Sequence, residues 1–180
     1  MNKENKTMFV NKIEIGFIKK MLNRFWYFLG YFGPGNSLRV LANRARGVKI
    51  GKNVFIDAMV HIDTAVPQLI TIEDNVKLSI GVKIFAHNSV FQDINPKDPI
   101  AISPVLIKKR AQIAPNAIIL EGVTIGRNSI IGTSAVVNKD IPDGCIAVGI
   151  PAKPIKKYKE AREMFLKEIN KRSLKSSKFF

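Results

Sequence analysis

The chain contains only two histidines, His61 and His87, and they occupy different settings. His87 lies where an even ladder of apolar residues stops, within KLSIGVKIFAHNSVFQDINPKDPIAISPVLI (residues 77–107). Imidazole has an ordinary pKa of about 6.5, so near neutral pH it can take a proton from a hydroxyl group and return it. His87 is therefore the candidate general base. His61, at a turn-prone position, is predicted to be structural.

The ladder is interrupted from Val90 to Pro104, after His87. The dipeptides Asn95-Pro96 and Asp98-Pro99 lie inside this stretch, and proline disfavours regular structure both at its own position and at the residue before it. Long loops in an otherwise regular repeat are usually functional. We expect residues 90–104 to leave the body of the protein beside His87.

The ladder itself has a period of six. The aliphatic residues that mark it form four sets of three: Ile50, Ile56 and Ile62; Ile72, Leu78 and Ile84; Ile107, Ile113 and Ile119; Ile125, Ile131 and Val137. A helix would place successive members on opposite sides, whereas three short strands joined by tight turns would point all of them inward. Coils of this kind stack as parallel strands around one continuous core. The sequence predicts an all-β core of hexapeptide repeats.

Charge and composition separate the chain into three predicted parts. The formal net charge is +15, but residues 1–49 carry +8 and residues 155–180 carry +6, so the middle is nearly neutral. A duplex-binding domain would usually carry its basic residues on the folded body, so this distribution disfavours nucleic acid. We predict an N-terminal basic helical segment (1–47), a repeat domain (48–154, with the insertion 90–104) and a C-terminal basic helix or tail (155–180). The single cysteine, Cys145, excludes an internal disulfide.

Apolar and aromatic residues recur at helical spacing from Phe17 to Phe32, with basic residues on the other side, and Gly33-Pro34-Gly35 ends the pattern. The charges leave no apolar run near the ~18–20 residues that a membrane span requires. Two readings stay open. The helix either lies on a membrane surface, which would place the protein at the cytoplasmic inner face, or caps the repeat domain or a partner subunit.

The repeat and the segment EGVTIGRNSIIGTSAVVNKDIPDGCIAVGIPAKPIK (residues 121–156) resemble the hexapeptide-repeat acyltransferases. The closing segment is similar to that of the branch containing maltose and galactoside O-acetyltransferases. The resemblance implies a left-handed parallel β-helix, a homotrimer, and acyl-CoA lying in a groove between neighbouring subunits without a metal. It implies transfer of an acetyl group from acetyl-CoA to a small-molecule acceptor, most simply a sugar hydroxyl in polysaccharide or surface-glycan assembly, with His87 as the base.

The same resemblance implies further site residues. Positions that match basic or polar groups around CoA are Lys139, Lys153, Lys156, Thr133 and Asn138. Pro115 occupies another cofactor position, in Gln112-Ile113-Ala114-Pro115, where the family often has Trp-Ile-Gly and a small residue. Proline has no N–H, so an oxyanion donor must come from another amide, for which Gly122 is the candidate. Asp57 and Asp63 are expected near the acceptor, with orientation of the histidine as an alternative role.

In the register of the hexads, Ala65 and Gly122 are the neighbours of His87 in the coils before and after it. We therefore expect space around the imidazole and little effect of its removal on folding.

Two histidines are too few for the three-histidine metal site of the γ-type carbonic anhydrases, which share this kind of repeat. Two alternatives to O-acylation stay open: an N-acyltransferase acting on an amino sugar, and a β-helix assembly scaffold without catalysis.

Overall fold

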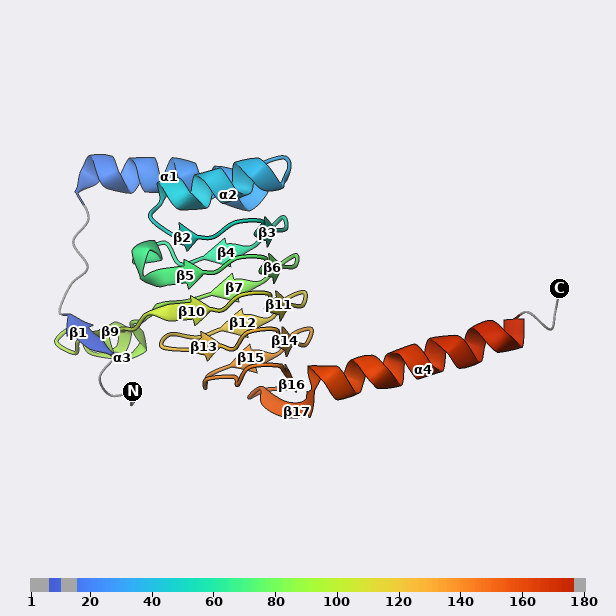
Figure 1. The fold of residues 1–180 in the computed structure, drawn as a ribbon. Helices are drawn as coiled ribbons and strands as arrows, with labels where there is room; N and C mark the ends of the chain where they lie inside the picture. Colours follow the sequence, from blue (N-terminus) through green and yellow to red (C-terminus); the bar gives the residue numbers. More distant parts are fainter. Residues whose placement is uncertain (1–6, 11–15, 177–180) are drawn as a thin grey trace.

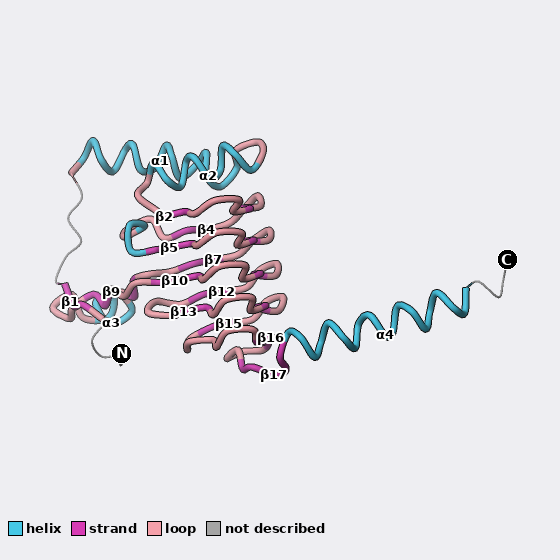
Figure 2. Tube along the Cα trace, in the orientation of Figure 1, coloured by secondary structure: helices cyan, strands magenta, loops and turns pink. Residues whose placement is uncertain are grey.

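Short parallel strands stacked in three columns form the body of the protein in the computed structural model, which describes residues 7–10 and 16–176 (Figures 1 and 2). The first column contains β2 (Lys49–Ile50), β5 (Ile70–Ile72), β10 (Val105–Ile107) and β13 (Thr124–Ile125). The second contains β3 (Phe55–Ile56), β6 (Lys77–Leu78), β11 (Gln112–Ile113) and β14 (Ile130–Ile131). The third contains β4 (His61–Ile62), β7 (Lys83–Ile84), β12 (Ile118–Ile119) and β15 (Val136–Val137).

The pairing of these strands confirms the predicted period of six. Within each column the marker aliphatics pair in register: Ile50, Ile72, Ile107 and Ile125; Ile56, Leu78, Ile113 and Ile131; Ile62, Ile84, Ile119 and Val137. Apart from Ile50 in the end coil, all of them are almost completely buried. β-branched side chains pack well on the pleated surface of a sheet. Here the rows of aliphatic side chains from the three columns fill the interior of the coils and form the core. The chain is a parallel β-helix.

Two of the three corners of each coil are tight and regular. After the first column, a residue with left-handed backbone recurs at Asn53, Asn75, Arg110 and Asn128, and after the second column at Met59, Gly81, Asn116 and Ser134. Asparagine and glycine adopt this conformation most readily, which explains their frequency here. The repeated conformation keeps each coil the same length.

The third corner, after the third column, is irregular, and both interruptions of the repeat fall there. The first is short and holds the 3₁₀ turn η2 (Pro67–Leu69). The second is the predicted insertion, which contains α3 (Val90–Ile94) and β9 (Ile100–Ile102). β9 pairs antiparallel with β8 (His87–Asn88) on one side and with β1 (Met8–Val10) on the other. The insertion therefore forms a small sheet beside His87, which the sequence pattern did not indicate.

Two helices cover the first-coil end of the stack, α1 (Phe17–Phe32) and α2 (Asn36–Ala45) (Figure 1). The sequence predicted α1 and its end at Gly33, but not α2, which is short and polar on average although its apolar residues lie on one side. Arg46, just after α2, is buried and joins the helices to the β-helix. Its guanidinium donates to the backbone oxygens of Ile62 and Asp63 and to the side-chain oxygens of Asn23 and Asn43.

Replacing Arg46 by alanine is expected to lower the free energy of unfolding by about 2–4 kcal/mol, because several buried oxygens lose their donor together. Burial lowers the pKa of Arg46 to about 10, which leaves the guanidinium charged at neutral pH. Arg44, exposed on the same turn, donates to the backbone oxygens of Ile50 and Gly51 and is the matched control. Arg44→Ala should cost about 1 kcal/mol or less. Urea unfolding of the two variants measures the difference, and equal midpoints would contradict the structural role of Arg46.

The last strands and helix close the other end of the stack. β16 (Cys145–Val148) continues the second column in parallel, and β17 (Lys153–Lys157) turns back against it in antiparallel orientation. α4 (Tyr158–Ser176) then projects away from the body (Figure 1). No helix within residues 7–10 and 16–176 is long and apolar enough to cross a membrane. The division of the chain into parts at residues 47 and 154 stays a prediction.

Candidate active site

His87 and Asp63 meet at the third corner, where successive coils stack. Asp63 follows β4 at this corner in the first coil, and His87 lies just after β7 at the same corner in the second. The Nδ1 atom of His87 lies 2.6 Å from Oδ2 of Asp63. The imidazole side chain is 26% exposed, whereas the carboxylate is completely buried. A buried acid that holds one ring nitrogen of a partly exposed histidine is a general-base arrangement.

The short contact sets the proton position on the ring. A carboxylate can only accept, so Nδ1 carries the hydrogen and Nε2 keeps its lone pair in the neutral ring. The hydrogen bond to Asp63 raises the pKa of His87 above its ordinary value, although burial of the ring opposes it. The negative charges of Asp63, Glu121 and Asp93 add to the increase. Nε2 is accordingly a stronger base than the nitrogen of an isolated imidazole.

Asp63 is held rigidly by backbone amides. Oδ1 accepts from the N–H groups of Ala65 and Val66, and Oδ2 accepts from Ala86 in the next coil as well as from His87. Burial raises the pKa of this carboxyl, but the hydrogen bonds from His87, Ala86 and Ala65 outweigh it, so the net shift is downward. Asp63 is therefore ionised at neutral pH. Its full burial keeps it from an acceptor and favours the orienting role over direct binding.

The surroundings of His87 differ from the open space expected between Ala65 and Gly122. The ring contacts the buried Asp63, and β8 pairs with β9 at Ile102. Gly122 has a left-handed backbone, and a Cβ atom there would lie 3.3 Å from Cβ of Ser103. Removing the imidazole would therefore leave a buried carboxylate with one donor fewer. The expectation that no buried group would lose a partner is wrong.

A cavity of about 210 Å³ opens at the same corner. It is lined by Thr7, Ala101, Ser103, Leu120, Glu121, Gly122 and Asn138. Ser103 and Thr7 share a hydrogen bond of 2.7 Å between their hydroxyl oxygens, so the segment before β1 supplies part of the wall. Asn88, next to His87, donates to Oε1 of Glu121 at 3.3 Å. The sequence did not indicate Thr7, Asn88, Ser103 or Glu121, because non-local pairing brings them together.

The predicted cofactor and acceptor residues fall on different corners. Asn138 and Lys139 follow β15 at the third corner, and Asn138 lines the cavity. Pro115, Thr133 and Asp57 lie at the second corner, on another edge of the same coils. The oxygen of Pro115 accepts from the N–H of Ser134, and Asp57 accepts from the N–H of Ala58. One subunit therefore does not bring all of these residues to His87.

Lys153 and Lys156 lie on β17, at the far end of the stack from α1. Lys153 is exposed, and Nζ of Lys156 lies 2.8 Å from Sδ of Met164 on α4. Lys139 is exposed. Lys139 and Lys153 are thus accessible near the end of the stack that lies away from α1, and Lys156 is partly buried.

His61, the other histidine, is structural. Its Nδ1 atom is 3.0 Å from the hydroxyl oxygen of Tyr27 on α1, and its ring packs against Phe85. Burial lowers the pKa of His61, with the nearby charge of Asp63 opposing the shift. The ring is neutral near pH 7 and connects α1 to the first coil.

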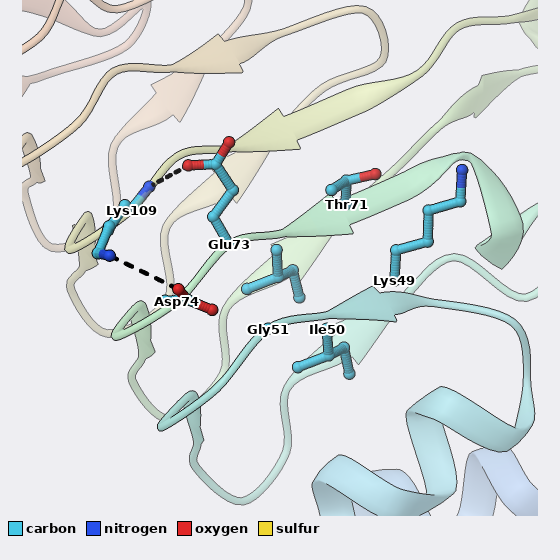
Figure 3. Close-up of a pocket in the computed structure, with 8 residues that line it drawn as sticks. Lys49, Ile50, Gly51, Thr71, Glu73, Asp74 and Lys109 are labelled. Atoms are coloured by element: carbon cyan, nitrogen blue, oxygen red, sulfur yellow. Dashed lines mark hydrogen bonds and ion pairs between the residues drawn. The ribbon is translucent and has the colours of Figure 1, made fainter.

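A second hollow, of about 370 Å³, lies on the first column near the opposite corner (Figure 3). Its two carboxylates are held by Lys109, since Glu73 accepts from the backbone N–H of Lys109 and Oδ2 of Asp74 lies 3.6 Å from Nζ of the same lysine. It contains no histidine, and its two carboxylates, Glu73 and Asp74, are engaged in these contacts. Among the described residues no cluster of three His, Cys, Asp or Glu side chains could hold a metal ion. The third corner is the better candidate site.

Comparison with known proteins supports the repeat and its class. Residues 104–139 match the family model described as bacterial transferase hexapeptide (six repeats). Over 66 residues the chain is 41% identical to 2,3,4,5-tetrahydropyridine-2,6-dicarboxylate N-acetyltransferases from several strains of Staphylococcus aureus. The match covers 37% of this chain and only 28% of each relative, so the chain spans little more than a quarter of their length.

Among solved structures, a maltose O-acetyltransferase from Clostridium difficile 630 is 26% identical, with a TM-score of 0.57 over 78% of this chain and 84% of that one. A polySia specific acetyltransferase is 31% identical, with a TM-score of 0.51 over 62% of this chain and 52% of that one. A hexapeptide-repeat-containing acetyltransferase from Vibrio cholerae shares the fold (TM-score 0.64, 20% identity, 78% and 91% of the chains). These likenesses confirm the resemblance to hexapeptide-repeat acyltransferases and imply left-handed winding.

Proposed function

We propose that the protein is an acetyl-CoA-dependent acyltransferase with His87 as its general base. The observation that carries the proposal is the 2.6 Å contact between His87 and the buried Asp63 beside a polar cavity. It leaves Nε2 of the neutral imidazole with its lone pair, on a side chain that is 26% exposed, at the corner where the predicted CoA residues Asn138 and Lys139 also lie. We also propose that the N-terminal basic segment holds the protein at the inner face of a membrane as a peripheral protein.

The reaction follows from these groups. Nε2 of His87 takes the acceptor proton as the acceptor oxygen attacks the thioester carbonyl of acetyl-CoA. The Asp63 carboxylate stabilises the imidazolium, and the N–H of Gly122, in the cavity wall, is the candidate donor to the oxyanion. The carbon–sulfur bond then breaks, and the imidazolium returns the proton to the CoA thiolate. The acyl group ends on the acceptor, and the enzyme regains its starting protonation.

A trimer accounts for the residues that one subunit leaves apart. Pro115, Thr133 and Asp57 line the second corner, so they would reach His87 only from a neighbouring subunit. A groove formed by the third corner of one subunit and the second corner of the next would gather both sets. Asp57 would then face the acceptor, and Asp63 would orient the base. This groove would be incomplete in a monomer. Sedimentation of the purified protein tests whether it forms the trimer.

Two acceptor classes remain under the proposal. A sugar hydroxyl is favoured by the likeness to the maltose O-acetyltransferase. An amino group is the second candidate because relatives that are 41% identical over 66 residues are N-acetyltransferases. A scaffold without catalysis is disfavoured because it would have no use for an ionised, buried carboxylate beside a partly exposed histidine.

The proposal is tested by thiol release from acetyl-CoA. Purified protein is mixed with acetyl-CoA and a thiol reagent, alone and with a panel of oligosaccharides, simple sugars and amino sugars. Acceptor-dependent release of CoA is expected, and mass spectrometry of the product separates O- from N-acetylation. Tight binding of acetyl-CoA without turnover on any acceptor would favour the scaffold, and failure to bind acetyl-CoA would contradict the proposal.

Lys139→Ala is expected to raise the Michaelis constant for acetyl-CoA about tenfold, equivalent to ~1.4 kcal/mol, with little change in turnover. The physical reason is the loss of a charge-assisted contact to a CoA phosphate, so the effect should shrink for an analogue lacking the 3′-phosphate. Lys153→Ala should behave in the same way. Lys52, exposed at the first corner, is the control, and Lys52→Ala should leave the constant unchanged. An unchanged constant in both test variants would make these lysines ordinary surface charges.

A further inference from the structure

The helix α1 presents its apolar side to the outside of the protein. Its exposed large apolar residues are Phe17, Ile18, Met21, Leu22, Phe25, Phe28 and Phe32, which we call the outer face of α1. Even the least exposed of them, Leu22, is 54% accessible, and Phe17 is 77% accessible. Residues at this spacing lie on one side of a helix. A helix that only covered the first coil would bury this side instead.

The opposite side of α1 is fixed to the β-helix. The side-chain amide of Asn23 donates to the backbone oxygen of Thr64, and Tyr27 contacts His61. The backbone oxygen of Tyr31 accepts from the N–H of Met59. The guanidinium of Arg46 also lies 5.0 Å from the ring centre of Tyr27. These contacts hold α1 across the first-coil end of the stack (Figure 1), and the residues of its outer face stay exposed.

The charges around this face have one sign. No aspartate or glutamate occurs from residue 15 to residue 56, and Lys20 and Arg24 are exposed on α1, one turn apart. Two copies of such a surface would repel each other. A layer of anionic lipid headgroups would instead attract the cations while the aromatic side chains enter the apolar boundary. Charge complementarity therefore selects lipid over a second copy as the occupant.

We propose that the outer face of α1 docks the protein onto anionic membranes as an interfacial helix. The helix has 16 residues, so it is about 24 Å long at 1.5 Å per residue and lies in the plane of the membrane surface. The contacts of Asn23, Tyr27 and Tyr31 keep the β-helix on the aqueous side. The surface is separate from the candidate active site and does not depend on the acyl-transfer chemistry.

Cosedimentation of the full-length protein with vesicles tests the proposal. We expect binding to vesicles of phosphatidylcholine and phosphatidylglycerol, weak binding to phosphatidylcholine alone, and release at about 1 M salt, where charges are screened beyond ~3 Å. Phe25→Glu, at an exposed position, should reduce the partition coefficient at least ~10-fold, because it replaces buried apolar area by a charge that anionic lipid repels. Lys20→Gln combined with Arg24→Gln should remove the preference for anionic vesicles.

Phe165 provides the matched control. It is an exposed phenylalanine on α4, 64% accessible against 57% for Phe25, so Phe165→Glu makes the same chemical change elsewhere. Phe165→Glu should leave vesicle binding unchanged, and circular dichroism checks that both variants fold. Equal binding by wild type and Phe25→Glu, or no preference for anionic lipid, would overturn the proposal. It would also be overturned if Phe25→Glu abolished self-association of the wild type without affecting vesicles, since the face would then be a contact between copies.

Discussion

Replacing His87 by glutamine is expected to lower turnover by roughly 10²–10⁴-fold, the usual contribution of a positioned general base. Glutamine can still donate an N–H to the buried carboxylate of Asp63, so the loss should appear in catalysis and not in folding. Alanine is the poorer choice, because it leaves Asp63 without its side-chain donor. Steady-state kinetics with acetyl-CoA and the best acceptor of the panel measure the effect.

The pH dependence of the wild type supplies an independent reading of the same residue. The base acts only when the imidazole is neutral, so kcat/KM should rise with pH through the pKa of His87. Because the hydrogen bond to Asp63 raises this pKa, the midpoint should lie above the ordinary value of about 6.5. The rising limb should disappear in His87→Gln.

His61→Gln is the matched control for the other histidine. It breaks the contact with Tyr27 and should reduce stability, but turnover should change less than about threefold, since the hydrogen bond of His61 goes to Tyr27 and not to Asp63 or His87. Wild-type turnover by His87→Gln, or equal losses in both variants, would mean that the base lies elsewhere.

The parts of the fold that sequence could predict are those that repeat. A period of six, as in Ile107, Ile113 and Ile119, has only one economical solution, a triangular coil, because each member must face the core and pairs in register with its counterpart in the neighbouring coil. Helix α2 lies outside the repeat and is polar on average. Its attachment to the coils depends on the buried Arg46, which follows it. Its existence is decided by tertiary contacts that no local pattern contains.

The same distinction applies to the candidate site. His87 could be singled out because it stands at a break in a regular ladder, and its role as the base stays a prediction. The resemblance offers Asp63 either near the acceptor or as the residue that orients the histidine, and the hexads cannot decide between these roles. Asp63 is 24 residues away, and whether its carboxylate turns inward or outward depends on the amides of the irregular third corner. The contribution of Thr7 to the cavity wall is still harder to predict, because Thr7 and Ser103 are 96 residues apart in the sequence.

Asp63→Asn is expected to lower turnover by about 10²–10³-fold without removing the base itself. The asparagine oxygen can keep the N–H groups of Ala65 and Val66, which turns its amide group toward His87. An amide N–H can only donate, so Nδ1 of His87 becomes the acceptor and the ring hydrogen moves to Nε2. The nitrogen that should take the acceptor proton then already carries one. The same amide group also faces the N–H of Ala86, so a loss of about 1–3 kcal/mol in stability is expected as well.

Two measurements separate this tautomer effect from simple destabilisation. Nitrogen-15 chemical shifts of the two histidines should show the hydrogen of His87 on Nδ1 in the wild type and on Nε2 in Asp63→Asn, with His61 as an internal reference. The pKa of His87 should fall, because the hydrogen bond that raises it is lost, so any residual activity should begin at lower pH than in the wild type. Asp74→Asn, at an exposed carboxylate on the first column, should change neither property. A variant Asp63→Asn that keeps its tautomer yet loses activity would show that Asp63 acts by holding the corner together, and one that changes tautomer yet keeps full turnover would show that Nε2 is not the base.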